Sequence, residues 1–457
     1  MKKSLSIFFI LFLIIPHAHA QTWNAVGSAG FSAGRAGYTS IALDATSSPY
    51  VAYLDGGNDN KATVMKYNGS NWVNVGTAGF SAGEVGFTSI AIDKNGTPYV
   101  VYEDLANSYK ATVMKYNGSS WVSVGTAGFS AGRANNTSIA IDSSGIPYVA
   151  YEDFVNNYKT TVMKYSGGSW VNVGSVGFSA GQADNTSIAI DENGTPYVTY
   201  EDYANSYKAT VMKYNGSNWI TVGIAGFSLG IAYSTFIAID TQGTPYVTYA
   251  DGSNNSKATV MRYNGGNWET VGSSSGFSSC NAFYTCIAID GNGTPYVVYS
   301  DDYNCLGDYG PATVMKYNGS NWVAEGSTRF SPGIAYSTAI AISKGGTLYV
   351  AFEDSVNGYK ATVMEYGFPN ETKNISNAVP SLTISTNPNN GSFTLNIPSP
   401  TKEAATITIT NMLGQQVKEF TTTTNTDIQI QLASPPGIYF ISARTQQGAQ
   451  SSKIVIW

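Results

Sequence analysis

Short segments rich in Val, Ile, Thr and Tyr recur along most of the chain, separated by turns rich in Gly, Asn, Asp and Pro. Each repeat contains four of them, of the types T-S-I-A-I-D, P-Y-V-x-Y, K-A-T-V-M-K-Y and N-W-V-x-V-G. β-Branched and aromatic residues in runs of this length, bounded by turn residues, are typical of β-strands. No segment places its apolar residues at helical spacing over a useful length. The pattern therefore predicts four strands per repeat and an all-β fold.

Tryptophan marks the period of the repeat, which is 49 residues except for a final interval of 54. Four strands within a period of roughly 20–50 residues predict one blade of a β-propeller per repeat. The repeats start near Trp23, Trp72, Trp121, Trp170, Trp219, Trp268 and Trp322.

The two ends of the repeat region predict how the propeller closes. The last repeat lacks its own W-x-x-V-G segment, whereas an unpaired W-N-A-V-G opens the first repeat at residues 23–27. We therefore expect a seven-bladed β-propeller over residues 21–367, in which the N-terminal strand completes the last blade. This pairing would also remove an exposed sheet edge. The I-D-x-x-G-x-x-Y-V core resembles NHL and two-component-regulator propeller repeats, which implies a propeller but no particular function.

Residues 1–20 have the features of a secretory signal. Lys2 and Lys3 precede an apolar stretch, and A-H-A at residues 18–20 is a small-residue cleavage site. The apolar stretch is too short for a membrane span, and no later segment approaches the ~20 apolar residues that a span needs. We therefore expect export and no transmembrane segment. At the other end of the propeller, residues 368–380 are predicted to be a linker.

Residues 381–457 contain alternating apolar and Thr-rich runs with Pro and Gly turns, which predict a small antiparallel β-sandwich. Four motifs follow in order: T-N-P-N-N-G-S-F-T-L at 386–395, I-T-N-M-L-G-Q-Q-V at 409–417, P-P-G-I-Y-F-I at 435–441, and the terminal S-K-I-V-I-W. This segment resembles the type A C-terminal sorting domain of the type IX secretion system of certain Gram-negative bacteria. The resemblance implies that this machinery exports the protein from the periplasm, and that the protein is then secreted or attached to the cell surface. A generic adhesive sandwich is the alternative.

Composition narrows the function. Only 12% of residues are charged, the formal net charge is −6, and no Lys/Arg cluster predicts nucleic-acid binding. The two histidines, His17 and His19, both fall in the predicted signal. The mature chain therefore lacks the residue needed for Ser-His-Asp or Cys-His catalysis and for His-ligated metal sites. We assign no catalytic residue and no metal ligand.

All three cysteines lie in the sixth repeat. A disulfide is expected in an exported protein. The preferred pair is Cys280–Cys305, which would join two loops on one face and leave Cys286 buried at the start of a strand. Cys286–Cys305 is the alternative.

Two long connections in each repeat, V-G-x-x-G-F-S-A-G and Y-E-D-x-x-N-x-Y-K, predict a loop-rich face. Alternate connections of a blade emerge on the same side, and loops on a rigid scaffold tend to carry binding residues. In the second connection an Asp precedes an Asn by three residues in every repeat. These residues are either oxygen ligands for calcium or sugar hydroxyls, or a loop held by side-chain to backbone bonds and an Asp–Lys ion pair. Because the Asp and Asn recur identically in every repeat, we favour the second role, in which they hold the loop in shape. The pairs are Asp55/Asn58, Asp104/Asn107, Asp153/Asn156, Asp202/Asn205, Asp251/Asn254, Asp301/Asn304 and Asp354/Asn357.

Variable positions within this constant frame are better candidates for ligand contact. Aromatic rings beside Asn and Asp are typical of carbohydrate sites, because the ring covers apolar C–H groups while polar groups bind hydroxyls. Loop drift after duplication is the alternative interpretation. The candidates, just before the innermost strand or a few positions earlier, are Tyr38, Phe87, Asn136, Asn185, Tyr233, Tyr284, Tyr336, Arg35 and Arg133.

These observations predict an exported, non-catalytic binding protein whose ligand is a glycan or another surface macromolecule. One alternative is a polysaccharide-degrading hydrolase or lyase, since paired carboxylates need no histidine. Its candidate residues are Asp301, Asp302 and Asp308 of the enlarged sixth repeat. A structural surface component is the other alternative. No cofactor is expected, and calcium stays an open alternative at the Asp/Asn loops.

Overall fold

The computed structural model describes residues 21–367, 382–385, 388–399, 401–411, 415–445 and 448–456. The predicted signal at 1–20 and the predicted linker at 368–380 lie outside these residues. The chain divides into two compact units, which we describe separately.

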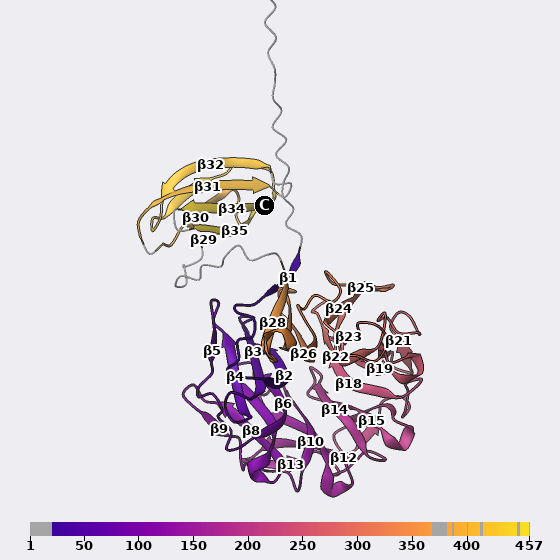
Figure 1. Ribbon diagram of the computed structural model, residues 1–457. Helices are drawn as coiled ribbons and strands as arrows, with labels where there is room; N and C mark the ends of the chain where they lie inside the picture. Colours follow the sequence, from indigo (N-terminus) through magenta and orange to yellow (C-terminus); the bar gives the residue numbers. More distant parts are fainter. Residues whose placement is uncertain are drawn as a thin grey trace, which may run out of the picture. The chain divides into compact units, whose positions relative to one another are not determined.

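The first unit consists of seven four-stranded antiparallel sheets, the blades, arranged as a ring (Figure 1). The innermost strands are β2 (Ala36–Leu43), β6 (Val85–Ile92), β10 (Ala134–Ile141), β14 (Ala183–Ile190), β18 (Ala232–Ile239), β22 (Ala282–Ile289) and β26 (Ala335–Ile342). The second strands are β3 (Pro49–Asp55), β7 (Pro98–Asp104), β11 (Pro147–Asp153), β15 (Pro196–Asp202), β19 (Pro245–Asp251), β23 (Pro295–Asp301) and β27 (Leu348–Asp354).

The third strands are β4 (Lys61–Tyr67), β8 (Lys110–Tyr116), β12 (Lys159–Ser166), β16 (Lys208–Tyr214), β20 (Lys257–Tyr263), β24 (Ala312–Tyr317) and β28 (Lys360–Gly367). The outermost strands are β5 (Trp72–Asn74), β9 (Trp121–Ser123), β13 (Ser169–Asn172), β17 (Trp219–Thr221), β21 (Trp268–Thr270), β25 (Trp322–Ala324) and β1 (Thr22–Ala25). Short 3₁₀ turns follow five second strands: η1 (Leu105–Asn107), η2 (Phe154–Asn156), η3 (Tyr203–Asn205), η4 (Gly252–Asn254) and η5 (Ser355–Asn357).

The N-terminal strand completes the last blade, as predicted. β1 pairs antiparallel with β28, and Trp23 lies opposite Tyr366 in this pairing. The innermost strands contact one another in sequence order, and β26 contacts β2. The first and last repeats are therefore neighbours in a ring of seven blades.

The second strand of each blade forms the centre of the packing. In β7, β11, β15, β19 and β23 every residue is buried. Each blade has neighbours on both of its faces, so a central strand is covered on both sides and its sequence does not alternate between apolar and polar residues. This explains why P-Y-V-x-Y lacks the two-residue periodicity of a strand with one wet face.

A tryptophan clasp joins successive blades, and we use this name for the following pair of contacts. The outer-strand Trp of one blade stacks on the Phe of the connection arriving from the preceding blade, with ring centroids 3.8–4.2 Å apart. Its indole N–H also donates to a backbone carbonyl of that connection at 2.6–2.8 Å. Trp23 forms the seventh clasp with Phe330 and the Glu325 carbonyl, which lie more than 300 residues further along the chain.

The second unit is a β-sandwich, which confirms the predicted fold of the C-terminal segment. One sheet has the order β29-β30-β33 and the other β32-β31-β34-β35. Phe393, Leu395, Ile407, Ile441 and Ile454 form part of the core between the sheets. The strands are β29 (Thr383–Ser385), β30 (Ser392–Asn396), β31 (Ala404–Asn411), β32 (Gln416–Thr423), β33 (Ile428–Gln431), β34 (Gly437–Thr445) and β35 (Gly448–Ile456).

The seventh clasp gives a first prediction. Removing residues 21–27 from the mature protein exposes the edge of β28 and deletes the Trp23 contacts, and Trp23→Ala deletes the contacts alone. Loss of a large packed aromatic residue costs about 3–5 kcal/mol, so both changes should lower the melting temperature by about 5 °C or more. Calorimetry measures this, with Val73→Ala on the exposed surface of β5 as control. An unchanged melting temperature for Trp23→Ala would show that this clasp does not hold the ring.

Candidate functional site

Every innermost strand contains a β-bulge near its start. In β2, for example, the pairing with β3 shifts register between Gly37 and Ser40. One residue inside each bulge has a left-handed backbone, with φ between 48° and 53°, although none of the seven is glycine. These residues, which we call the mouth ring, are Tyr38, Phe87, Asn136, Asn185, Ser234, Tyr284 and Ser337.

A left-handed backbone is unfavourable for a residue with a side chain, by roughly 1–2 kcal/mol, and persists only where surrounding structure holds it. Here the next residue supplies the restraint. Thr88, which follows Phe87, donates its hydroxyl to the Tyr38 carbonyl of the preceding blade at 2.5 Å. Five other threonines make the same bond at 2.5–2.8 Å. The bulges are therefore part of the contact between blades.

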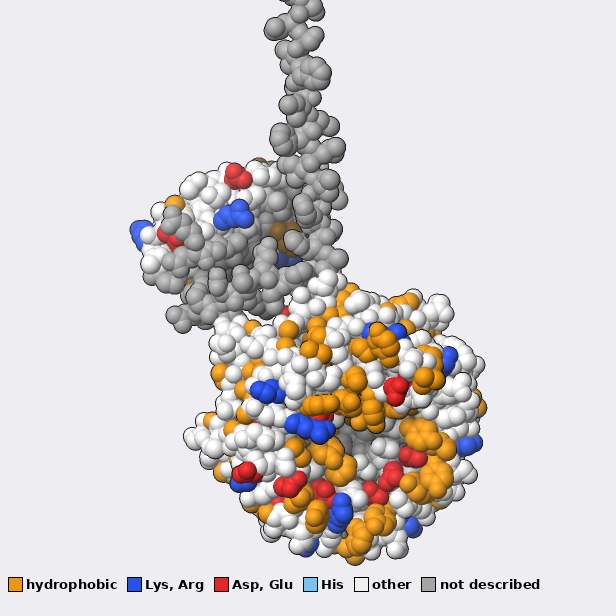
Figure 2. All heavy atoms as spheres, viewed as in Figure 1, with side chains coloured by type: hydrophobic (Ala, Val, Ile, Leu, Met, Phe, Trp, Pro, Cys, Tyr) orange, Lys and Arg blue, Asp and Glu red, His pale blue; other side chains and the backbone are white. Residues whose placement is uncertain are grey.

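The mouth ring lines a central cavity of about 770 Å³. Figure 2 shows a hollow on the visible face of the propeller, with hydrophobic side chains grouped around it. A volume of this size lies within the roughly 300–1,000 Å³ of small-molecule sites. Because the backbone is the same in all blades, the side chains of the ring determine its chemistry.

The two halves of the ring differ. Blades six, one and two carry the aromatic mouth-ring residues Tyr284, Tyr38 and Phe87, and in blade seven Tyr336 lines the cavity beside Ser337. The rings of Tyr38 and Phe87 lie 5.0 Å apart, and those of Tyr284 and Tyr336 6.4 Å. Blades three, four and five present polar residues, which are Asn136, Asn185 and Ser234. The cavity therefore has an aromatic wall and an amide-rich wall.

Two arginines that directly precede innermost strands are paired with buried glutamates. Arg35 contacts Glu353 across the first and last blades at 2.6 Å, and Arg133 contacts Glu103 at 2.8 Å. Burial raises the pKa of both glutamates, and the neighbouring guanidinium partly offsets this effect. These arginines consequently have their charge balanced within the protein.

At the same blade position Glu152 and Glu201 have no arginine partner among the ion pairs of the described residues. They are only 4% and 6% exposed, and the Asn136 and Asn185 side chains donate to them at 3.4 and 3.0 Å. Burial raises the pKa of Glu152 to about 8, with a further contribution from Asp184, and burial raises that of Glu201 to about 7. Glu152, Asp184 and Glu201 thus form an acidic cluster next to the amide-rich wall.

The Asp/Asn connections serve as loop supports in six of the seven repeats. The Asn amide donates to the Asp carboxylate at 2.8 Å in these loops. In five of them, Asp55 among others, the carboxylate also accepts a threonine hydroxyl from the third strand. The expectation of an Asp–Lys ion pair is wrong, because none of the ion pairs of the described residues joins these Asp and Lys side chains, and the Asp carboxylates accept from Asn and Thr instead. No group of three or more His, Cys, Asp or Glu suited to a metal occurs among the described residues.

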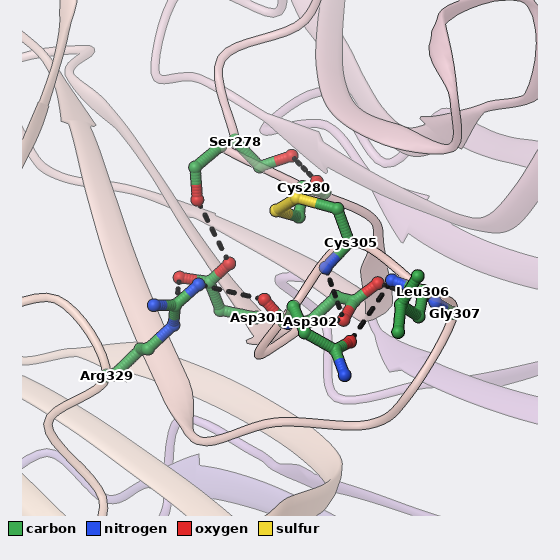
Figure 3. The surroundings of a disulfide bond; sticks show 10 residues. Ser278, Cys280, Asp301, Asp302, Cys305, Leu306, Gly307 and Arg329 are labelled. Carbon is green, nitrogen blue, oxygen red and sulfur yellow. Dashed lines mark hydrogen bonds and ion pairs between the residues drawn. A yellow bond between two sulfur atoms is a disulfide. The ribbon is translucent and has the colours of Figure 1, made fainter.

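The sixth repeat departs from this pattern. Cys280 and Cys305 form a disulfide (Figure 3). Cys286 is unpaired and buried within β22. Asp302 lies beside the disulfide and accepts from the backbone N–H groups of Asn304, Cys305 and Gly307 at 2.8–3.1 Å. Burial alone would raise the pKa of Asp302, but these backbone donors outweigh it and hold the pKa below its usual value.

Asp301 contacts Arg329 at 3.3 Å and accepts the Thr313 hydroxyl at 3.1 Å. Asp308 accepts an amide N–H of Asn304 at 3.3 Å. The three carboxylates that a sixth-repeat enzyme would use thus all have partners within the protein.

The structure brings most of the predicted ligand-binding residues together. Tyr38, Phe87, Asn136, Asn185, Tyr284, Tyr336 and Arg35 line the central cavity. Tyr233 and Arg133 are not among its lining residues. The expectation that Tyr38 and its equivalents precede the innermost strand is wrong, because the bulge lies within the strand itself. Arg35 and Arg133 do precede their strands, as expected. The sequence did not predict the acidic cluster, because the approach of Asp184 to Glu152 of the preceding blade is visible only in the folded protein.

Comparison with known proteins identifies the C-terminal unit. Residues 385–457 match the family model for the secretion system C-terminal sorting domain. The chain is therefore an exported protein, attached to the surface or secreted, and its sorting domain implies the type IX secretion machinery as a partner. No helix long and apolar enough to cross a membrane occurs in the described part of the chain. No curated protein matched, and the resemblance of the blades to NHL repeats stays a prediction.

Among solved structures, an ulvan lyase of polysaccharide lyase family PL25 is 13% identical, with 75% of this chain and 95% of that chain covered and a TM-score of 0.49. AofleA from Arthrobotrys oligospora is 10% identical, covering 66% and 88%, with a TM-score of 0.45. The SapL1 lectin in complex with alpha methyl fucoside is 17% identical, covering 67% and 99%, with a TM-score of 0.42. At these TM-scores the similarity is too weak to bear on function.

The acidic cluster gives a prediction about pH. Because the pKa values of Glu152 and Glu201 are raised in the folded state, the folded protein binds more protons than the unfolded chain between about pH 4.5 and 8. Stability should fall as pH rises through this window. Glu201→Gln removes one such group and should stabilise the protein by about 2 kcal/mol at pH 8.5, with little effect at pH 4.

Thermal unfolding at the two pH values measures this difference. Glu269→Gln is the control, because the Arg262 ion pair lowers the pKa of that exposed glutamate and the residue stays ionised throughout the window. An equal pH dependence in Glu201→Gln and the unsubstituted protein would contradict the assignment.

Proposed function

We propose that the mouth ring is a carbohydrate-binding site and that the protein is a non-catalytic glycan-binding protein at the cell surface or in the surroundings of the cell. The observation that carries this proposal is the contrast between a constant backbone and variable side chains. All seven bulges share one conformation, with φ of 48–53°, while the residues inside them are, in chain order, Tyr, Phe, Asn, Asn, Ser, Tyr and Ser. Positions that build the blade are the same in each repeat, so the variable positions are the ones available for recognition.

The side chains of the ring support carbohydrate as the ligand class. Tyr38 is 42% exposed although its backbone is held by a neighbouring blade, so an aromatic face is presented to solvent on a rigid support. Asn136 and Asn185, on the opposite wall, offer amide groups that bind hydroxyls. Apolar faces combined with a few polar groups are typical of small-molecule sites, and sugars have both kinds of surface.

The hydrolase or lyase alternative in the sixth repeat has less support. Asp302 accepts three backbone N–H groups, and Asp301 is paired with Arg329. A general acid in glycoside cleavage needs a raised pKa and a carboxyl group free to reach the glycosidic oxygen. The lowered pKa of Asp302 is the opposite of this requirement. Burial raises the pKa of Asp301, but Arg329 and Thr313 hold its carboxylate.

Glycan-array screening of the mature protein, followed by calorimetric titration of the best ligand, tests the proposal. Tyr38→Asn is the informative variant, because Asn136 and Asn185 already occupy the equivalent position with the same backbone. Folding should be unaffected. Loss of the aromatic contact, about 1–1.5 kcal/mol, should weaken binding roughly tenfold.

Tyr207→Asn is the matched control. Tyr207 is equally exposed and also has a positive φ, lies outside the lining of the central cavity, and has Asn60 as its equivalent in the first repeat. Absence of binding to every glycan on the array, or a Tyr38→Asn variant that folds and binds glycan normally, would refute a carbohydrate site at the mouth ring.

A further inference from the structure

A second cavity, present at the enlarged sixth repeat, adjoins the central one. It measures about 510 Å³, and we call it the loop-six cleft. Three tyrosines, two prolines and one carboxylate provide most of its lining: Tyr303, Tyr309, Tyr336, Pro311, Pro332 and Asp308. The connection between β23 and β24 supplies four of these six residues.

The two cavities are joined through shared aromatic residues. Tyr336 lines both the central cavity and the loop-six cleft. Its ring lies 5.1 Å from that of Tyr309, which in turn lies 5.5 Å from the ring of Tyr284 in the mouth ring. A row of aromatic rings therefore runs from the mouth ring to the cleft.

The cleft is held in place before any ligand binds. The Cys280–Cys305 disulfide fixes one side of the connection, and the Asp302 carboxylate accepts three of its backbone N–H groups. Tyr303 lies against the Arg329 guanidinium, 5.4 Å from the ring centre, yet stays 69% exposed. A loop that is already ordered does not lose further conformational entropy on binding.

The charges around both cavities disfavour an acidic ligand. Arg35 lines the central cavity and Arg329 lies against Tyr303 of the cleft, and each is paired with a buried carboxylate, which is Glu353 or Asp301. Glu84 of the central cavity and Asp308 of the cleft are carboxylates with no arginine partner among the ion pairs of the described residues. A polyanionic glycan would need unpaired cations to balance its charge, so the charge pattern favours a neutral chain.

We infer that the ligand is a linear, uncharged oligosaccharide that occupies the mouth ring and extends over Tyr336 and Tyr309 into the loop-six cleft, one molecule per protein. This inference rests on the proposed function and adds the ligand class, its path and its stoichiometry. Repeated blades alone would instead offer several equivalent sites. The asymmetry of the ring and the single enlarged connection leave one path with aromatic contacts along its whole length.

Titration calorimetry with oligosaccharides of increasing length tests the path. The probes are cello-, xylo-, laminari- and N-acetylated chito-oligosaccharides of two to six sugars, with hexagalacturonate as the anionic comparison. Affinity should rise with length at a stoichiometry of one. Tyr303→Ala should weaken hexasaccharide binding about tenfold and leave disaccharide binding unchanged.

Leu306→Ala is the control in the same connection, because Leu306 is 80% exposed and does not line the cleft. Tyr38→Asn, in the mouth ring, should weaken binding at every length. If Tyr38→Asn weakens binding and Tyr303→Ala has no effect at any length, the path into the cleft is wrong while the carbohydrate site stands.

Two further results would overturn the inference. Preference for hexagalacturonate over all neutral hexasaccharides would refute the uncharged ligand, and a stoichiometry above one would refute the single path. Absence of binding to any of these probes, with binding to other glycans on the array, would also refute the neutral linear ligand. Absence of binding to every glycan would instead remove the proposed function itself.

Discussion

The structure depends on the tryptophan clasp between successive blades. A blade of four short strands has two extensive faces to bury, and burial requires a neighbour on each side. The Phe–Trp stack and the indole hydrogen bond fix that neighbour at the outer edge, while the threonine hydroxyls fix it at the inner edge. In the last clasp Trp23 reaches Phe330, so the two ends of the repeat region hold each other.

Because the Trp, Phe and Thr side chains hold the blades together, the side chains of the mouth ring can vary. Once Trp, Phe and Thr determine the spacing between blades, the residue in the bulge can be Tyr, Asn or Ser without a change in backbone. The result is an approximately symmetric scaffold with an asymmetric centre. One wall is aromatic, the other contains amides backed by buried carboxylates, and the sixth repeat adds a cleft braced by a disulfide. Such a centre is suited to one oriented ligand rather than to seven equivalent ones.

Much of the fold could be predicted from the sequence, because the repeat makes the blade pattern explicit. The unpaired W-N-A-V-G segment predicted the pairing of β1 with β28, and the four C-terminal motifs predicted the sorting domain. The site was harder to predict from the sequence. A one-residue bulge leaves no mark in the apolar pattern, so the candidate positions were placed before the strand rather than in it. Contacts between blades, such as Arg35 with Glu353 or Glu152 near Asp184, join side chains of different repeats, and the repeat pattern does not show which of them meet.

The most direct test of this account is a crystal structure of the exported protein with a neutral hexasaccharide bound. We predict density for one sugar chain per protein, with one end among the residues of the mouth ring and the other beside Tyr303 and Pro311 of the loop-six cleft. Density at several equivalent Asp/Asn loops, or on the outer strands with an empty central cavity, would contradict it.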